Sequence, residues 1–276
     1  MTAGFCLQQP AVMKLLTMKI ATWNVNSIKI RMGVLTNWLK ENEIDVVCFQ
    51  ETKTVDENFP IDELREAGYE SAILGEKSYN GVAIVSRFPI EDVQKNMLDD
   101  AEDAPKRLIA GTVNGVRIVN TYIPNGTELG TDKFTFKLDW LQRLRRFFDE
   151  TCEVSKDVLL CGDFNVAMDD LDVWNVGAWE GKLHFTKTER AAMYNVKQWG
   201  FVDVFRKLNG DAQEFSWWNY REGAWQRNRG LRIDYIWTTP SLADKCTACH
   251  IDRVPRALEK PSDHAPVIAE FDLSKN

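Results

Sequence analysis

The sequence has no run of about 20 apolar residues, the length that a membrane-spanning helix requires. It also has no positively charged segment ahead of its first apolar residues, so no signal peptide is predicted and a cytoplasmic location is expected. No linker, low-complexity stretch or internal repeat divides the chain. Residues 1–17 are expected to be a disordered N-terminal extension, and residues 18–276 are expected to form a single domain.

Several signatures of familiar catalytic chemistries are also missing. The 276 residues include three histidines, and no cluster of cysteines and histidines has the spacing of a zinc site. The chain has no Gly-x-Ser-x-Gly, Walker or Gly-x-Gly-x-x-Gly sequence. Cys246 and Cys249 precede His250 with the spacing of a haem-attachment site, but that motif belongs to exported chains, so we interpret it as a chance match. Zinc chemistry, a serine nucleophile and a Walker-type phosphate loop are therefore not indicated.

Positive charge is in short supply. The chain has 34 lysines and arginines against 41 aspartates and glutamates, which gives a net charge of -7. This balance argues against a protein that coats nucleic acid through bulk positive charge. The charge is unevenly distributed, however: residues 41–70 carry ten acids and two bases, whereas residues 206–260 carry ten bases and seven acids. Any contact with a polyanion is expected to be confined to one face and to weaken with salt.

What the chain does contain is a series of short apolar runs rich in β-branched residues, which indicate strands, and fewer helical patterns. Strands are predicted at residues 18–25, 45–50, 70–75, 81–86, 107–113, 116–122, 157–162, 231–237, 245–251 and 266–271, and helices at 31–42, 61–67, 132–151 and 187–198. Thr186 and Glu189 fit a capping box at the start of the last helix, and Asn114-Gly115 fits a tight hairpin turn. Because a hairpin joins antiparallel strands, the sequence predicts two packed mixed sheets flanked by helices.

Strongly polar residues follow or interrupt six of the predicted strands. They are Asn24 and Asn26, Gln50 and Glu51, Tyr122, Asp163 and Asn165, Asp234, and Asp263 with His264. Side chains two residues apart on an extended strand point to the same side, so Asp163 and Asn165 are expected to face one cleft. A single Asp or Asn after a strand is usually a turn residue. Six such positions together indicate a functional site.

The chemistry of these residues favours metal-assisted hydrolysis. Glu51, Asp163 and Asp263 are hard oxygen donors, which suit Mg²⁺ or Mn²⁺. His264 is a candidate base, provided that another group orients its ring. The side chain of the adjacent Asp263 diverges from His264 in an extended segment, so the orienting carboxylate is expected to be Asp234.

Taken together, six motifs resemble those of the endonuclease/exonuclease/phosphatase superfamily. They are Trp23-Asn-Val-Asn26, Gln50-Glu-Thr-Lys53, Tyr122-Ile-Pro-Asn-Gly126, Gly162-Asp-Phe-Asn165, Arg232-Ile-Asp234 and Ser262-Asp-His-Ala-Pro266. Their order and spacing match from about residue 18 to residue 271. Within the superfamily, Gln50-Glu-Thr-Lys53, Phe215-Ser-Trp-Trp218 and Asn228-Arg-Gly-Leu-Arg-Ile-Asp234 resemble the exonuclease III/apurinic-apyrimidinic endonuclease family. The resemblance implies a four-layer α/β sandwich of the DNase I type, with the site at one edge of the two sheets.

The resemblance also implies roles for the matched residues. Glu51 would be the principal ligand of Mg²⁺, for which Mn²⁺ would substitute, and the other implied ligands are Asn24, Asp163, Asn165, Asp263 and His264. Asp163 and Asn165 would hold or activate the attacking water, and Tyr122 would hydrogen-bond the phosphate. His264, oriented by Asp234, would bind the phosphate or act as the base. Whether Asp163 or His264 takes the proton, and whether one metal ion or two act, stays open at this stage.

A further set of residues would contact DNA. Trp217 and Leu231 match positions that line the pocket for a base-less sugar, and Trp174 lies in a loop that the family places against DNA. Lys53, Arg229 and Asn26 are the remaining candidate contacts. An abasic nucleotide costs little to extrude from a duplex because no base pair is broken.

The implied function is therefore that of a Mg²⁺-dependent DNA-repair nuclease acting in base excision repair. It would cut 5′ to abasic sites, degrade duplex DNA as a 3′-to-5′ exonuclease and remove 3′ phosphates, and it is expected to be a monomer that binds double-stranded DNA and no membrane. One alternative keeps the fold but changes the substrate to a phosphoinositide, sphingomyelin or RNA. Another is a DNA-binding protein that has lost catalysis, which the intact catalytic positions disfavour.

Overall fold

The computed structural model describes residues 17–275. Its strands are β1 (Thr17–Asn24), β2 (Val46–Gln50), β3 (Glu70–Leu74), β4 (Val82–Ser86), β5 (Glu91–Lys95), β6 (Leu108–Val113), β7 (Val116–Tyr122), β8 (Val158–Asp163), β9 (Val202–Asp203), β10 (Asp234–Thr238), β11 (Cys246–Ile251) and β12 (Val267–Asp272). The α-helices are α1 (Ile28–Glu41), α2 (Ile61–Glu66), α3 (Asp132–Thr151), α4 (Val176–Trp179), α5 (Lys187–Lys197), α6 (Val204–Asn209) and α7 (Pro240–Lys245). The predicted extension at residues 1–17 lies outside the described residues, except for Thr17.

The strands form two six-stranded mixed sheets. The first sheet has the order β11-β12-β1-β2-β4-β3, and the second has the order β5-β6-β7-β8-β10-β9. Each sheet is built around one parallel pair, β1 with β2 and β7 with β8, and its other pairings are antiparallel. The carboxyl ends of the two parallel pairs therefore place Asn24, Gln50, Tyr122 and Asp163 at one edge of the molecule.

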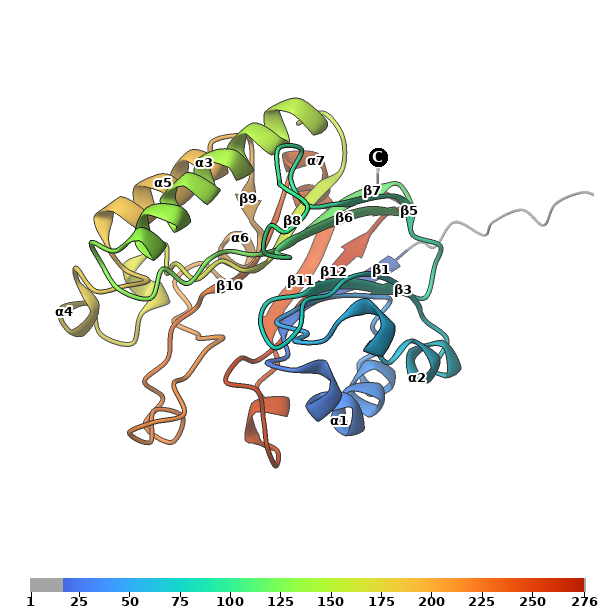
Figure 1. Ribbon diagram of the computed structural model, residues 1–276, viewed down its shortest axis with the longest axis horizontal. Coiled ribbons are helices and arrows are strands. Elements are labelled where there is room, and N and C mark those ends of the chain that lie inside the picture. Colours follow the sequence, from blue (N-terminus) through green and yellow to red (C-terminus); the bar gives the residue numbers. More distant parts are fainter. Residues whose placement is uncertain (1–16, 276) are drawn as a thin grey trace, which may run out of the picture.

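Helices cover the outer face of each sheet, which makes the predicted four-layer sandwich (Figure 1). One apolar cluster fills the space between the sheets, a second joins the second sheet to α3 and α5, and a third joins the first sheet to α1 and α2. Burial of side chains on both faces explains why the central strands read as almost continuous apolar runs.

Two local signals in the sequence are confirmed. The Thr186 hydroxyl accepts a hydrogen bond from the Glu189 N–H, and the Glu189 carboxylate accepts one from the Thr186 N–H. These two bonds complete the capping box of α5. The hairpin between β6 and β7 turns at Asn114 and Gly115, whose φ angles are 49° and 83°. Positive φ at both positions is what a type I′ turn requires, and Asn-Gly meets it at the least steric cost.

Several expectations about elements were wrong or incomplete. The strand predicted at 231–237 begins at Asp234, because Leu231 pairs instead with Trp217 and Val173 as isolated bridges. Strands β5 and β9 and helices α4, α6 and α7 were not predicted. These elements are short, and β5 is largely exposed, so they lack a strong apolar period. Within residues 17–275 no helix is both long and apolar enough to cross a membrane.

A buried amide pair joins the two sheets directly beneath the polar edge. The Gln50 Nε2 atom donates to the Asn120 Oδ1 atom across 2.7 Å, and the Asn120 Nδ2 atom donates to the backbone carbonyls of Phe49 and Ala83. Both side chains are fully buried. Because buried amides must be hydrogen-bonded, this pair fixes the register of one sheet against the other beneath the strand ends.

Candidate active site

The polar residues at the strand ends converge on one site that both sheets build. Asn24 is the last residue of β1, Glu51 follows β2, and His264 precedes β12, so these three come from the first sheet. Asp163 ends β8 and Asp234 begins β10, where the two residues lie opposite each other in antiparallel register. Together the two sheets bring residues from position 24 to position 264 into contact.

His264 and Asp234 form the buried side of the site. The His264 Nδ1 atom lies 2.8 Å from the nearer Asp234 carboxylate oxygen, which leaves the His264 Nε2 atom 3.7 Å from an Asp163 oxygen. Ser216 donates to Asp234 across 2.6 Å, and its hydroxyl accepts from the backbone N–H groups of Ile233 and Asp234. The predicted pairing of His264 with Asp234 is thus present, and Ser216 is a supporting residue that the sequence reasoning missed.

Electrostatics reinforce this geometry. Burial alone would lower the pKa of His264, but the carboxylates of Asp234 and Asp163 outweigh it and raise the pKa to about 10. The ring therefore carries its proton at neutral pH and presents the Nε2–H group toward Asp163. Burial also raises the pKa of Asp163 to about 7, against the opposing effect of His264.

Asp163 is held by amide groups as well as by the histidine. One carboxylate oxygen accepts from the Asn165 N–H at 2.9 Å, and the other accepts from the side-chain amides of Asn24 at 2.9 Å and Asn165 at 3.1 Å. The side chains of Asp163 and Asn165 are therefore in direct contact. The Asn165 side chain also contacts Asn125, whose Nδ2 atom lies 3.1 Å from the Asn165 Oδ1 atom.

Glu51 belongs to a more open chain of contacts on the other side of Asn24. The Asn24 side-chain amide donates to Glu51 across 2.8 Å, and Lys53 forms an ion pair with Glu51 at 2.7 Å. Lys53 also donates to Asn26 at 2.7 Å, and Asn26 donates in turn to Asp263 at 3.0 Å. Burial raises the pKa of Glu51, but the Lys53 ammonium and the Asn24 amide bring it below its ordinary value, so the carboxylate is charged at neutral pH.

Strained backbone marks the same loops. Asn26, Glu51, Lys53 and Asn165 all have φ between 44° and 52°, in the left-handed region that residues other than glycine rarely adopt. Each such residue costs about 1–3 kcal/mol unless its surroundings enforce it, and such residues cluster at functional sites. Here hydrogen bonds supply that enforcement: Lys53 joins Glu51 to Asn26, and the Asn165 side chain is held by Asp163 and Asn125.

Comparison with known proteins identifies this arrangement. Residues 21–264 match the model of the Endonuclease/Exonuclease/phosphatase family. The chain belongs to that family. Among curated relatives, the exodeoxyribonuclease III of Haemophilus influenzae is 34% identical over 266 residues, which cover 92% of this chain and 100% of the relative. The exodeoxyribonuclease of Bacillus subtilis is 32% identical and covers 91% of this chain and 98% of the relative.

Solved structures agree with this assignment. An AP endonuclease from Archaeoglobus fulgidus is 39% identical, covers 93% of this chain and 100% of its own, and has a TM-score of 0.90. The 3′-5′ exonuclease NExo from Neisseria meningitidis is 40% identical, covers 92% of this chain and 100% of its own, and has a TM-score of 0.89. The chain is therefore an enzyme of the exonuclease III group within the endonuclease/exonuclease/phosphatase family.

Enzymes of this family depend on a metal ion, and the donor set of the site fits one. Glu51 and Asp163 are carboxylates separated by a single amide, and the Lys53 ammonium beside Glu51 marks a place where positive charge is favoured. Among the described residues, the acidic and histidine ligand atoms that lie within 4.8 Å of one another belong to Asp163, Asp234 and His264. The carboxylate oxygens of Glu51 and Asp163 are hard donors, which suit a divalent cation such as Mg²⁺.

The six predicted metal ligands are divided between two sets of contacts, and their role as ligands stays a prediction. Asn24 turns its Nδ2 atom toward both carboxylates, and its Oδ1 atom accepts the Asn26 N–H at 3.0 Å. The Asp263 carboxylate accepts from Asn26 and from the Trp217 indole N–H, both at 3.0 Å, and so belongs to the same set of contacts as Lys53 and Glu51. These hydrogen bonds, together with His264, bring the pKa of Asp263 below its ordinary value although burial raises it. The spacing of residues in a sequence does not reveal which atom of an amide faces a site.

Tyr122 lies on the wall of a cavity of about 310 Å³ that it shares with Glu51 and Lys53. The guanidinium of Arg107 stacks over the Tyr122 ring, 4.6 Å from its centre, and donates to the Tyr122 carbonyl. Burial and the nearby Glu51 raise the pKa of Tyr122 well above its ordinary value. The phenol therefore keeps its proton and can donate a hydrogen bond, as the predicted phosphate contact requires. Arg107 is a neighbour that the sequence reasoning did not single out.

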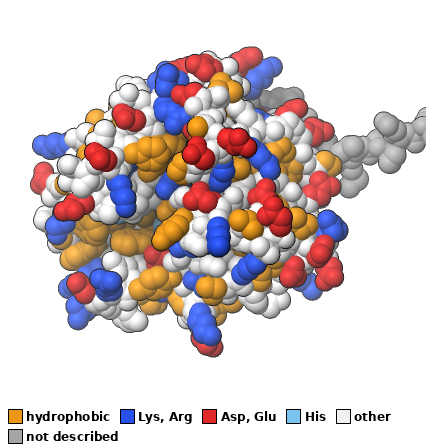
Figure 2. Space-filling model, in the orientation of Figure 1, with side chains coloured by type: hydrophobic (Ala, Val, Ile, Leu, Met, Phe, Trp, Pro, Cys, Tyr) orange, Lys and Arg blue, Asp and Glu red, His pale blue; other side chains and the backbone are white. Residues whose placement is uncertain are grey.

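A second cavity, of about 360 Å³, lies beside Trp217 and is lined by Trp174 and Arg229 among others. Arg229 stacks over Trp174, 5.0 Å from the centre of its ring. Hydrophobic side chains gather in a hollow between α4 and the neighbouring 219–229 loop (Figure 2). Trp217 connects this cavity to the catalytic residues through its hydrogen bond to Asp263. Two predicted DNA contacts, Trp174 and Arg229, thus lie together beside Trp217.

Leu231 requires a correction. It was expected to line the sugar pocket, but it is completely buried and packs in a small core with Val173 and Phe185. Its backbone exchanges two hydrogen bonds of 2.9 Å with Trp217. Leu231 therefore holds Trp217 through these two backbone hydrogen bonds, and its own side chain is buried in the core.

Proposed function

We propose that this enzyme is a Mg²⁺-dependent DNA-repair nuclease that hydrolyses phosphodiester bonds at abasic sites and at 3′ ends. It cuts duplex DNA 5′ to abasic sites, removes nucleotides from 3′ ends and removes 3′ phosphates. The observation that carries this proposal is the joining of Asp163, His264 and Asp234 beside a Trp217-lined cavity, in a chain of the exonuclease III group. The names of the relatives support each activity: exodeoxyribonuclease III, AP endonuclease and, for a Neisseria structure bound to product DNA hairpin, 3′ phosphatase.

The proposed reaction is an in-line attack of water on phosphorus. Asp163 accepts the proton of the water, because its carboxylate is fixed by Asn24 and Asn165 and its pKa of about 7 suits a base at neutral pH. His264, held by Asp234 and protonated, donates from Nε2 to a phosphate oxygen, and Tyr122 donates to the same phosphoryl group.

Glu51, with Asp163 and Asp263 nearby, would hold Mg²⁺, and Mn²⁺ would substitute. The ion supplies Lewis-acid stabilisation of the charge that develops on the phosphoryl oxygens and on the departing 3′ oxygen. The Lys53 ammonium would have to leave Glu51 or share it for this purpose. Asn26, which accepts from Lys53, offers the ammonium an alternative partner.

The proposed partner is double-stranded DNA with abasic sites, nicks or 3′ ends, and the protein is proposed to act as a cytoplasmic monomer. Positive and negative side chains are interspersed on the face of the molecule drawn in Figure 2, in keeping with the net charge of -7. A contact confined to the site and its two cavities is expected to weaken with salt.

A gel assay tests this proposal. Three end-labelled duplexes would carry an internal abasic site, a recessed 3′ end or a 3′ phosphate at a nick, each incubated with Mg²⁺, with Mn²⁺ or with chelator. We expect metal-dependent products from all three and none from the His264→Ala variant. An inositol phosphate assayed in parallel separates the alternative of a same-fold phosphodiesterase. Absence of metal-dependent cleavage on every DNA substrate would overturn the proposal.

A further inference from the structure

A buried ion pair lies next to the backbone of Asn165. Lys137 of α3 and Glu189 of α5 both have completely buried side chains, and their charged atoms lie 2.6 Å apart. The Lys137 ammonium also donates to the backbone carbonyls of Asn165 at 2.7 Å and Asn125 at 3.2 Å. All three ammonium hydrogens are therefore used, and two of them hold backbone next to the active site.

The stability of the fold does not explain this pair. Taking two charges out of water costs several kcal/mol each, and replacing a buried pair with apolar residues is often neutral or stabilising. Helices α3 and α5 already pack through apolar residues, including Leu141, Leu144, Met193 and Val196. Burial alone lowers the pKa of Lys137. A charged lysine at this place therefore calls for a reason other than helix packing.

The backbone that Lys137 holds is strained and lies beside Asp163. Asn165 has a φ of 52°, and its carbonyl accepts both the Lys137 ammonium and the His184 Nδ1–H, each at 2.7 Å. Two strong donors on one carbonyl fix the plane of the following peptide. The Asn165 side chain, turned the opposite way, contacts Asp163 and Asn125.

We propose that Lys137 is a positioning residue for phosphodiester hydrolysis, because its ammonium orients Asn165 and Asn125 and, through them, the Asp163 carboxylate. Glu189 keeps this ammonium charged and aimed while it caps α5. The proposal rests on the proposed function, in which Asp163 and Asn165 handle the attacking water. Lys137 itself touches no substrate, so its effect falls on the rate of the chemical step rather than on substrate binding.

The test uses a pair of substitutions that leaves no isolated buried charge. Lys137→Met combined with Glu189→Gln removes the ammonium, and glutamine still serves as the third residue of a capping box. We expect kcat to fall about 10- to 100-fold, because small displacements of catalytic groups lower rates by this much. KM is expected to change less than about threefold. If circular dichroism shows that this variant is unfolded, Lys137→Gln with Glu189→Gln changes the packing less and takes its place.

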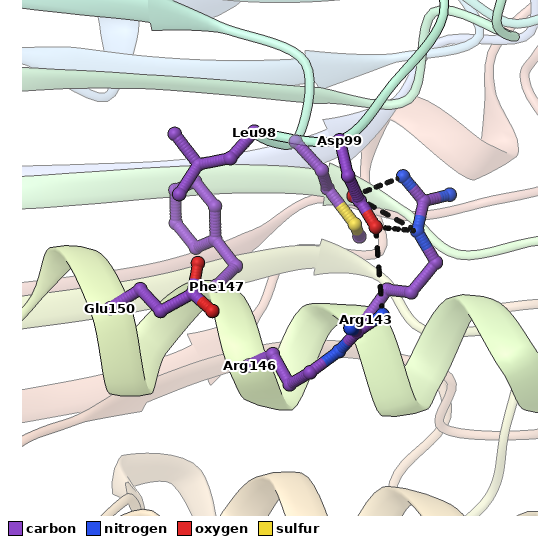
Figure 3. Close-up of a pocket in the computed structure, with 7 residues that line it drawn as sticks. Leu98, Asp99, Arg143, Arg146, Phe147 and Glu150 are labelled. Carbon is purple, nitrogen blue, oxygen red and sulfur yellow. Dashed lines mark hydrogen bonds and ion pairs between the residues drawn. The ribbon is translucent and has the colours of Figure 1, made fainter.

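Arg143 provides a matched control on the same helix. It forms ion pairs with Asp99 and Asp100 at the surface, beside a small cavity that includes Leu98 and Phe147 (Figure 3). Arg143→Met removes an ion pair of α3 that does not reach the active site, so we expect its kcat to stay within about twofold of the wild-type value. A folded Lys137 variant with a kcat within twofold of this control would overturn the proposal.

A second readout does not depend on activity. In the metal-free protein, the backbone amide resonances of Asp163 to Val166 are expected to shift in the Lys137 variant and to stay in place in Arg143→Met. Unchanged resonances at these positions would also overturn the positioning role. If wild-type protein cleaves no DNA substrate, the proposed nuclease function fails instead, and the resonances still report whether Lys137 orients Asn165.

Discussion

The active site has two unlike halves, and the buried one draws residues from both sheets. The half around Asp234 and His264 is buried, and its members contact one another directly: His264 is 4% exposed and Asp234 is 1% exposed. The half around Glu51 and Lys53 is open, and the side chains of these two residues are 17% and 27% exposed. Glu51 in this half is held by the Lys53 ammonium and the Asn24 amide, whereas His264 in the buried half is held by a buried carboxylate.

The difference separates two tasks. A buried histidine between carboxylates keeps a fixed ring orientation and a high pKa, which suits a group that stabilises charge in the same geometry at every turnover. An open carboxylate that pairs with a flexible lysine can exchange the ammonium for a metal cation, and the released ammonium can then pair with a phosphate. We therefore expect substitutions on the buried half to affect the chemical step, and those on the open half to affect metal and DNA binding.

The largest expected effect is that of His264→Ala. Removing the donor at Nε2 is expected to lower kcat by about 10³-fold or more, within the range found for groups that transfer or donate protons. The loss should not depend on the metal concentration. Glu51→Ala serves as the counterpart from the open half: it should also lose orders of magnitude, but regain part of its rate as Mg²⁺ is raised. Steady-state kinetics over a Mg²⁺ series check both, and equal recovery of the two variants would break the comparison.

Asp234→Asn is expected to have a smaller but more specific effect, a loss of about 10²-fold in kcat. The Asp234 carboxylate stabilises the imidazolium form, so its neutral replacement should move the pKa of His264 from about 10 down toward the ordinary 6.5. Because the folded pKa lies above the unfolded one, the stabilisation from this ion pair is present below about pH 6.5 and is lost as the pH rises through 10. A pH titration of the imidazole resonances in the metal-free proteins measures the shift. An unchanged midpoint in Asp234→Asn would contradict the proposed cause.

The smallest expected effect is that of Lys53→Met on the open half. Loss of one cation near the phosphates should weaken duplex binding severalfold and reduce the dependence of log Kd on log salt by about one unit. Binding of a labelled abasic duplex to the metal-free protein, over a range of salt concentrations, measures the slope. A variant that kept the wild-type slope would show that Lys53 serves Glu51 alone. Arg143→Met is a suitable control, because it also removes one positive charge, and the ion-pair partners of Arg143 are Asp99 and Asp100 rather than residues of the site.

The sequence predicted the main features of the fold and most members of the site. Ten of the strands were placed from apolar runs, because central strands buried on both faces have a strong and unambiguous pattern. The pairing of His264 with Asp234 followed from the divergence of neighbouring side chains in an extended segment. The short elements β9 and α4 were missed, because two to four residues carry no periodic signal.

Other features required the assembled molecule. Ser216, Asn120 and Lys137 support the site from beneath, but each lies in a segment whose sequence reads as ordinary strand, loop or helix. Leu231 matched a pocket motif and proved to be completely buried, because its side chain packs in a small core with Val173 and Phe185. A motif shows that a residue is near a site, but not which of its atoms points there.

The sequence by itself thus determined which residues stand at the strand ends, since strand periodicity and the order of motifs are local properties of the chain. Tertiary structure alone decided which charged groups contact one another and how their pKa values shift. The pKa of His264, the separation of Glu51 from Asp163 by Asn24 and the burial of Lys137 with Glu189 arise from groups that lie far apart in the chain. Desolvation and Coulomb interactions depend on distance in space, so these properties exist only once the two sheets have packed.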